Sequence, residues 1–234
     1  MKSSTPFLQR YLKKLTGWVL VLLFLFTGSL FLFSFIVHEV FWEKEEIVDH
    51  QIFNFLSSHV ISPPLTSIMK AITYCASRNF LQIAYGVVIV FFLIRKNWKR
   101  SVEIGVIGAG GFLINYLMKI SFGRVRPPNP LIDPLHNFSF PSGHATSGFI
   151  FYGLLVYLIW KSNISKPYKI IIGIALVLFA LLIGFSRVYL RVHYPSDVIA
   201  GFCIGFTWLS LSVWMMEILK KKSDVELKKM NQRN

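Results

Sequence analysis

Three short stretches of this sequence hold residues that could do chemistry. Residues 119–127 carry one lysine and two arginines, residues 141–144 read Pro-Ser-Gly-His, and residues 186–197 carry two arginines, a histidine and an aspartate. Cations of this kind bind phosphate, and imidazoles attack electrophiles or transfer protons near neutral pH. Together the three stretches predict a site that binds and cleaves a phosphorylated substrate.

Lys119, Arg126 and Arg187 are the cations that we expect to converge on the phosphate. Arginine offers two parallel hydrogen bonds to a phosphate, and lysine offers a compact charge. For each cation taken alone, the alternative is a side chain that extends toward lipid headgroups. Three cations beside the start of a helix favour the phosphate site.

The Pro-Ser-Gly-His stretch has the composition of a helix start. Proline suits the first helical position, so we expect Pro141 there. The free N–H groups of a first helical turn bind anions. Gly143 would let an oxyanion approach the backbone, and Ser142 offers a hydroxyl. This stretch therefore predicts a second wall of the phosphate site.

His193 and Asp197 are spaced so that one helical turn places them on the same face, and they can still meet if Pro195 starts the helix. A carboxylate bonded to one imidazole nitrogen fixes the tautomer and leaves the other nitrogen free as a nucleophile. His144 is then available as a general acid. The alternative is a metal site made by both histidines and Asp197, which the nearby cations disfavour because they repel a divalent ion.

The composition indicates an integral membrane protein. Of the 234 residues, 54% are hydrophobic and 15% are charged, against about 25% charged in a typical soluble domain. Six apolar runs are candidates to cross a hydrocarbon core about 30 Å thick. They are residues 15–37, 71–94, 104–118, 139–160, 170–186 and 198–216. We therefore predict an all-α fold of six transmembrane helices in one domain, residues 1–234, whose motif core is residues 119–197.

Most of the 25 lysines and arginines lie at alternate ends of these runs. They gather before residue 15 and within residues 95–100, 161–169 and 220–233, whereas the loop after the first run is acidic. By the positive-inside rule both termini are cytoplasmic, including a basic tail over residues 217–234, and the three chemical stretches face outward. The net charge of +14 is then a topology signal, and we expect no nucleic-acid partner.

Three further segments have distinctive patterns. The outer loop, residues 38–66, has apolar residues at roughly helical spacing before Pro63-Pro64, so we expect either a short interfacial helix or a connector tucked against the spans. Residues 15–37 are too long for a signal peptide and lack a small-residue cleavage site. Four glycines within residues 104–118 predict close packing of the third span, because small residues let backbones approach.

The three stretches resemble the motifs of the type 2 phosphatidic acid phosphatase superfamily. These motifs are Lys-x6-Arg-Pro, Pro-Ser-Gly-His and Ser-Arg-x5-His-x3-Asp, and this sequence matches every specified position in order. The resemblance implies a lipid phosphatase that needs no metal or cofactor and forms a phosphohistidine. It assigns nucleophilic attack to His193, its orientation to Asp197 and proton transfer to His144. It assigns the phosphoryl oxygens to the following residues: Lys119, Arg126, Ser142, Gly143 and Arg187.

The compact chain resembles the bacterial phosphatidylglycerophosphatase B type, so the expected reaction is hydrolysis of phosphatidylglycerophosphate to phosphatidylglycerol. Undecaprenyl diphosphate, phosphatidic acid and a broad range of lipid phosphates are alternatives. Soluble haloperoxidases share the motifs, but the hydropathy opposes that reading. A transporter of anions or lipids is the alternative from another class.

The apolar runs and the loop charges predict an enzyme of the cell membrane whose active site lies on the extracytoplasmic side. Its partners are then the lipid substrate and the surrounding lipids, with no obligate protein partner. The sequence leaves open the roles of Lys70, Arg78, Arg124 and Arg191. It also leaves open whether the loop over residues 38–66 gates the access of lipids.

Overall fold

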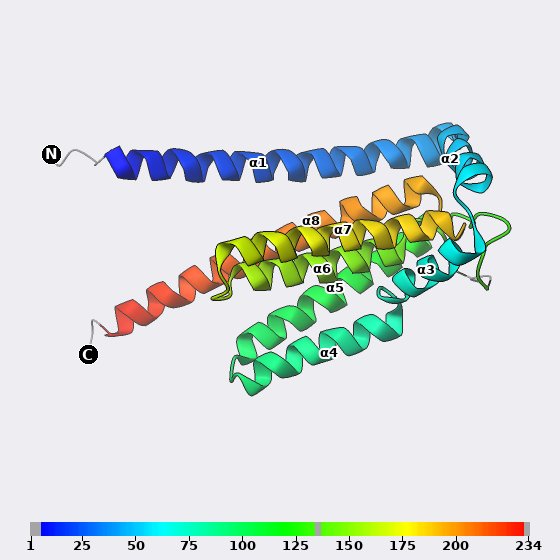
Figure 1. Cartoon of the computed structure of the whole chain (residues 1–234). Coiled ribbons are helices and arrows are strands. Elements are labelled where there is room, and N and C mark those ends of the chain that lie inside the picture. Colours follow the sequence, from blue (N-terminus) through cyan, green and yellow to red (C-terminus); the bar gives the residue numbers. More distant parts are fainter. Residues whose placement is uncertain (1–5, 134–136, 232–234) are drawn as a thin grey trace.

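The computed structural model describes residues 6–133 and 137–231, and this part of the chain is a bundle of helices joined by loops (Figure 1). A short π-helix, η1, continues the first helix. The elements are α1 (Pro6–Val37), η1 (His38–Glu43), α2 (Ile47–His59), α3 (Pro63–Tyr74), α4 (Arg78–Ile94), α5 (Trp98–Phe122), α6 (Gly143–Trp160), α7 (Lys166–Tyr189) and α8 (Pro195–Asn231).

The membrane-spanning plan predicted from hydropathy is confirmed, with one change at the second span. In the part of the chain that the structure describes, five helices are long and apolar enough to cross a membrane, and the pair α3 and α4, bent by 44°, is the sixth candidate span. The bend falls at residues 75–77, where the Ser77 hydroxyl accepts a hydrogen bond from the Phe80 amide at 3.3 Å and caps α4. Hydropathy did not reveal the break because the turn itself is uncharged.

The start of the fourth span differs from the expectation at Pro141. The helix α6 begins at Gly143, and Ser142 is its N-cap, with its hydroxyl 3.5 Å from the Ala145 amide. Serine is among the residues that best cap a helix. Pro141 therefore lies before the helix, in a loop that is held by a hydrogen bond from the Ser142 amide to the Asp197 carbonyl at 3.0 Å.

The sixth span is longer than expected. We predicted a span over residues 198–216 and a basic tail over residues 217–234, and α8 begins at Pro195 and continues as one helix to Asn231. Residues 232–234 lie outside the described part. Glu217 forms an ion pair with Lys161 at 2.6 Å and accepts a hydrogen bond from the Tyr157 hydroxyl at 2.7 Å. These two contacts join α8 to the C-terminal end of α6.

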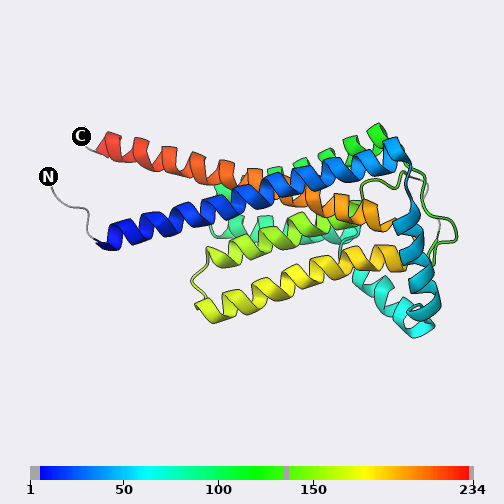
Figure 2. The same cartoon turned by 90° about the horizontal axis from the view of Figure 1, so that it is seen from above.

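The expected short helix after the first span is present as α2, which lies across one end of the bundle (Figure 1, Figure 2). Its Phe53 and Leu56 are buried against Val188 of α7 and Val198 of α8. The segment is therefore helical, as one expectation had it, and is tucked against the spans, as the other had it.

Close packing of α5 follows from its glycines, as the sequence predicted. A Cβ at Gly111 would lie 2.5 Å from the Ile150 Cδ1 of α6, and a Cβ at Gly110 would collide with the Trp208 ring of α8. The Trp208 ring is itself fixed by a hydrogen bond from its Nε1 to the Ile107 carbonyl at 2.9 Å. Small residues here let α5 approach both helices.

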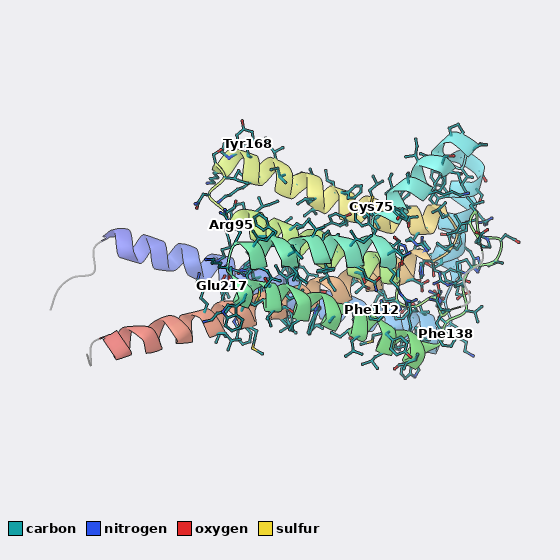
Figure 3. The ribbon with its side chains drawn as sticks, turned by 90° about the horizontal axis from the view of Figure 1, so that it is seen from below. Cys75, Arg95, Phe112, Phe138, Tyr168 and Glu217 are labelled. Carbon is teal, nitrogen blue, oxygen red and sulfur yellow. The ribbon has the colours of Figure 1, made fainter. Side chains whose placement is uncertain are left out.

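The two ends of the bundle differ in what they carry. The start of α1 and the end of α8 lie at the same end of the bundle, and α2 and the loops that hold the predicted site lie at the other (Figure 1, Figure 2). Phe138 of the loop after α5 lies at this second end, whereas Arg95, Tyr168 and Glu217 lie at the first (Figure 3). The fold therefore brings the three motif stretches to one end.

Candidate active site

The three motif stretches meet around one cavity of about 600 Å³. Lys119 comes from the last turn of α5, and Arg126 comes from the loop that follows it. The other motif residues in the cavity wall come from the first turn of α6, the last turn of α7 and the loop before α8; they are Gly143, His144, Arg187 and His193. Of the eight site residues that the sequence predicts, six line this cavity, and Ser142 and Asp197 lie behind it.

His193 is held from behind by Asp197, as the spacing predicted. The His193 Nδ1 lies 3.4 Å from the Asp197 Oδ2, and α8 begins at Pro195 between them. Ser139 lies beside both groups: its hydroxyl donates a short hydrogen bond to the Asp197 Oδ2 and is 3.3 Å from the His193 Nδ1. Both contacts favour a proton on Nδ1, which leaves the lone pair on Nε2.

The other nitrogen of His193 faces the cations. Its Nε2 lies 3.2 Å from the Arg126 Nη1, which is a donor and therefore fits an unprotonated Nε2. Burial and the nearby Arg126, Arg187 and Lys119 hold the pKa of His193 well below its ordinary value. A neutral imidazole with a free Nε2 lone pair is the form that can attack phosphorus.

The three cations are positioned by neutral oxygen atoms, so their charges are left for a ligand. The Lys119 Nζ donates to the Ser139 carbonyl at 3.3 Å, the Arg126 Nε donates to the Asn137 carbonyl at 2.8 Å, and the Arg187 Nη1 donates to the Thr73 hydroxyl at 2.8 Å. Burial is the main cause that lowers the pKa of Arg126 to about 10, a value at which it stays charged near neutral pH. A phosphate would supply the missing negative charge.

The first turn of α6 supplies the opposite wall of the cavity. Gly143 and His144 both line it, and a Cβ at Gly143 would lie 3.1 Å from the Asn115 Oδ1, so only a glycine fits here without a shift of its neighbour. Ser142 is fully buried and its hydroxyl caps the helix. A role of the Ser142 hydroxyl at the phosphate therefore stays a prediction.

The cavity continues from this cluster between α4 and α5. Its wall there is largely apolar and includes Tyr85 and Ile89 of α4 and the glycines 105, 108 and 111 of α5. Its polar residues include Arg78 and Gln82, which lie one turn apart on α4. Apolar space beside a cationic end suits a lipid with a phosphorylated headgroup.

Three residues of the site were not identified from the sequence. They are Ser139, Arg124 and Asp49. For Ser139 the hydroxyl side chain was the one sign of a role, and Arg124 lies at a position that the first motif leaves unspecified. Asp49 belongs to the acidic loop that served as a topology signal. Their roles depend on contacts between segments distant in sequence, which a linear pattern does not contain.

Comparison with known proteins identifies the family. A model of the PAP2 superfamily matches residues 100–221. Phosphatidylglycerophosphatase B of Bacillus subtilis is 34% identical over 164 residues, which cover 68% of this chain and 79% of the relative. The undecaprenyl-diphosphatase BcrC of Bacillus subtilis is 29% identical over 160 residues, which cover 63% of this chain and 75% of the relative.

A solved structure has the same fold. The crystal structure of the first transmembrane PAP2 type phosphatidylglycerolphosphate phosphatase from Bacillus subtilis matches with a TM-score of 0.75 at 26% identity, over 83% of this chain and 96% of that one. The match to the family model spans more than half of this chain and contains all three motif stretches. This protein therefore belongs to the PAP2 superfamily, and it is a membrane lipid phosphatase.

Proposed function

We propose that this enzyme hydrolyses the terminal phosphomonoester of phosphatidylglycerophosphate and releases phosphatidylglycerol on the extracytoplasmic side of the cell membrane. The observation that carries the reaction is the unprotonated Nε2 of His193, which lies 3.2 Å from the Arg126 Nη1 in the wall of a cavity that Lys119 and Arg187 also line and that continues between α4 and α5. The similarity to phosphatidylglycerophosphatase B supports the substrate. The basic loops at the opposite end of the bundle support the orientation.

In the proposed mechanism, the His193 Nε2 forms a bond to phosphorus while the bond from phosphorus to the bridging oxygen breaks. His144 gives its proton to that oxygen, and the lipid alcohol leaves. Water then attacks phosphorus, His144 takes a proton from the water, and the P–N bond breaks to restore neutral His193. Lys119, Arg126 and Arg187 stabilise the charge on the equatorial oxygens in both steps.

Arg78 supports a substrate with a second phosphate. It lines the cavity, and its guanidinium lies 5.5 Å from the centre of the Phe112 ring on α5. Phe112 and Lys119 share a face of α5 two turns apart, which is about 10 Å along the helix axis. Phosphatidylglycerophosphate carries a phosphodiester separated from its terminal phosphate by a glycerol. Arg78 would then bind the phosphodiester while the cation cluster binds the terminal phosphate.

A diphosphate is the second candidate substrate, because BcrC acts as an undecaprenyl-diphosphatase and its sequence is similar. The two phosphates of a diphosphate are adjacent, so one cluster of cations would bind both. Phosphatidic acid has a single phosphate and would gain nothing from Arg78. The three lipids therefore differ in their dependence on this residue.

The test is phosphate release from these three lipids in detergent with EDTA, by wild-type protein and by Arg78→Ala and Lys70→Ala. Lys70 is the matched control because it is an exposed cation of the neighbouring helix α3 that does not line the cavity. We expect phosphatidylglycerophosphate to be the best substrate by kcat/KM and Arg78→Ala to lower its kcat/KM about tenfold, with little effect on phosphatidic acid. A wild-type preference for another lipid would refute the proposed substrate.

A further inference from the structure

We propose that Arg124 is a positioning residue that joins Asp197 to Asp49 of α2, so that the docking of α2 on the bundle sets the orientation of His193. The inference concerns the same site and so rests on the phosphohistidine mechanism proposed above. It does not depend on which lipid is the substrate.

Arg124 is a buried cation that binds three carboxylates and does not line the cavity. Its Nη1 lies 2.7 Å from the Asp197 Oδ1, and its Nη2 lies 3.0 Å from the Asp49 Oδ2 and 2.9 Å from the Glu46 Oε1. The residue is 7% exposed, and its guanidinium stacks 3.9 Å from the centre of the Tyr194 ring. Burial opposes its charge, but the three carboxylates prevail and raise the pKa of Arg124.

The contact with Arg124 fixes the half of Asp197 that His193 does not touch. The Oδ2 of Asp197 accepts from the Ser139 hydroxyl and from the Tyr194 amide, the latter at 2.9 Å, and it faces the His193 Nδ1. The Oδ1 is held by Arg124. A carboxylate held at both oxygens keeps one plane and one distance to its imidazole, which is the geometry that an orienting carboxylate needs.

Asp49 extends the same network from α2 to the start of α8. Its Oδ1 accepts a hydrogen bond from the Ser196 amide at 3.0 Å, and its Oδ2 accepts one from the Ser196 hydroxyl. The Arg124 Nη1 donates to that same hydroxyl at 2.8 Å. Asp49 thus binds a free amide in the first turn of α8, where a negative charge is stabilised. Two buried carboxylates, those of Asp49 and Asp197, are held together by this one guanidinium.

Through this network, carboxylates of α2 and its N-cap hold Arg124, which in turn holds the Asp197 behind His193. The side chains of α2 that contribute are Glu46, at its N-cap, and Asp49 in its first turn. Loss of the arginine would leave two like charges buried side by side, which drives carboxylates apart or into protonation. Asp197 would then lose its fixed position behind His193, while the cations that bind phosphate would keep their own partners.

The test compares Arg124→Lys, Arg124→Met and Asp49→Asn with Glu45→Gln, a matched control whose carboxylate is exposed in the same acidic segment. The substrate is p-nitrophenyl phosphate, which needs the nucleophile and the phosphate site but little protonation of its leaving group. Thermal unfolding in detergent identifies the variants that are folded. Inhibition by inorganic phosphate reports the phosphate site separately from turnover.

We expect kcat to fall up to about 100-fold in folded Asp49→Asn and Arg124→Met, with an unchanged inhibition constant for inorganic phosphate, because the nucleophile is misplaced and the phosphate site is intact. Arg124→Lys should recover part of that loss, and Glu45→Gln should match the wild type. If Arg124→Met does not fold, the kcat values and inhibition constants of Asp49→Asn and Arg124→Lys test the inference. Wild-type kcat in the folded variants, or a loss that appears in phosphate binding instead, would overturn the inference.

Discussion

His193 and His144 line the same cavity with different partners, and this difference predicts different roles for them. His193 has Asp197 and Ser139 behind its Nδ1, whereas His144 lies in the first turn of α6 and has no carboxylate in its own motif. An imidazole near a helix N-terminus is biased toward the neutral form. A bound phosphate would reverse this bias locally, because its negative charge favours the imidazolium. We therefore expect His144 to become the acid only when substrate is present.

The first prediction separates the two histidines by substrate. His193→Ala should lose activity toward both lipid phosphates and p-nitrophenyl phosphate, because both need the nucleophile. His144→Ala should lose about 10²–10⁴-fold on lipid phosphates and less on p-nitrophenyl phosphate, whose leaving group needs little protonation. Steady-state rates of both variants on both substrates provide the measurement. Equal losses on both substrates in His144→Ala would contradict the assignment.

The second prediction concerns pH. Because the pKa of His193 is well below its ordinary value, the free enzyme keeps a neutral nucleophile as the pH falls below about 6.5, where an unperturbed histidine takes up a proton. The acidic limb of kcat/KM for p-nitrophenyl phosphate, corrected for ionisation of the substrate, should lie below that pH. Arg126→Gln removes a cation from beside the ring, so its limb should move to higher pH. A wild-type limb at pH 6.5 that Arg126→Gln leaves in place would contradict this account.

At the residue scale, the sequence predicted the members of the site that belong to fixed motifs. The order and spacing of Lys119, Arg126, Arg187 and His193 were enough, because these residues belong to one set of motifs and line one cavity. Arg124 and Asp49 could not be found in this way. The two residues lie 75 positions apart in the chain and meet only because α2 folds over the end of the bundle.

At the element scale, α5 performs two tasks on two faces. One face carries Gly110 and packs against the Trp208 ring of α8, and the other carries Gly105 and Gly108 along the cavity, where Gly108 also lies against the Tyr85 ring of α4. The glycines of the sequence predicted the close packing. They did not show which of them pack against helices and which line a space for the substrate, since spacing alone does not identify the neighbour of each face.

The third prediction tests this division of α5. Gly110→Ala places a methyl group against the Trp208 ring, which is held by its hydrogen bond to the Ile107 carbonyl and cannot move freely. Such overpacking costs about 1–3 kcal/mol, so the midpoint of thermal unfolding in detergent should fall. Gly105→Ala is the control, because its Cβ would lie 3.9 Å from the nearest atom, the Ile89 Cδ1. Equal midpoints for the two variants would contradict the packing account.

The helix boundaries show where reasoning from hydropathy fails. The apolar runs gave the number of spans, because the apolar length needed to cross a bilayer is a property of the sequence. The turn between α3 and α4 and the position of Pro141 outside α6 depend on side-chain caps, Ser77 and Ser142. A capping residue stabilises a helix by only about 1 kcal/mol, and it hardly changes the mean hydropathy of the segment around it.

At the scale of the whole molecule, the fourth prediction is the orientation in the membrane. Single cysteines at Glu45 and at Asn163, introduced with Cys75 and Cys203 replaced by alanine, report the two ends of the bundle. Both positions are exposed. In intact cells an impermeant thiol reagent should label position 45 and should leave position 163 unlabelled until the cells are opened. The opposite pattern would place the active site on the cytoplasmic side.

The central claim is that His193 carries the phosphoryl group during turnover, and trapping the phosphoenzyme tests it most directly. Purified protein in EDTA is mixed with phosphatidylglycerophosphate labelled in its terminal phosphate and quenched in denaturant within the first turnovers. We predict a labelled protein whose bond is stable in base and labile in acid, as a phosphohistidine is, and no label on His193→Ala. Label that persists on His193→Ala, or a wild-type protein that releases phosphate only with an added divalent ion, would contradict the account.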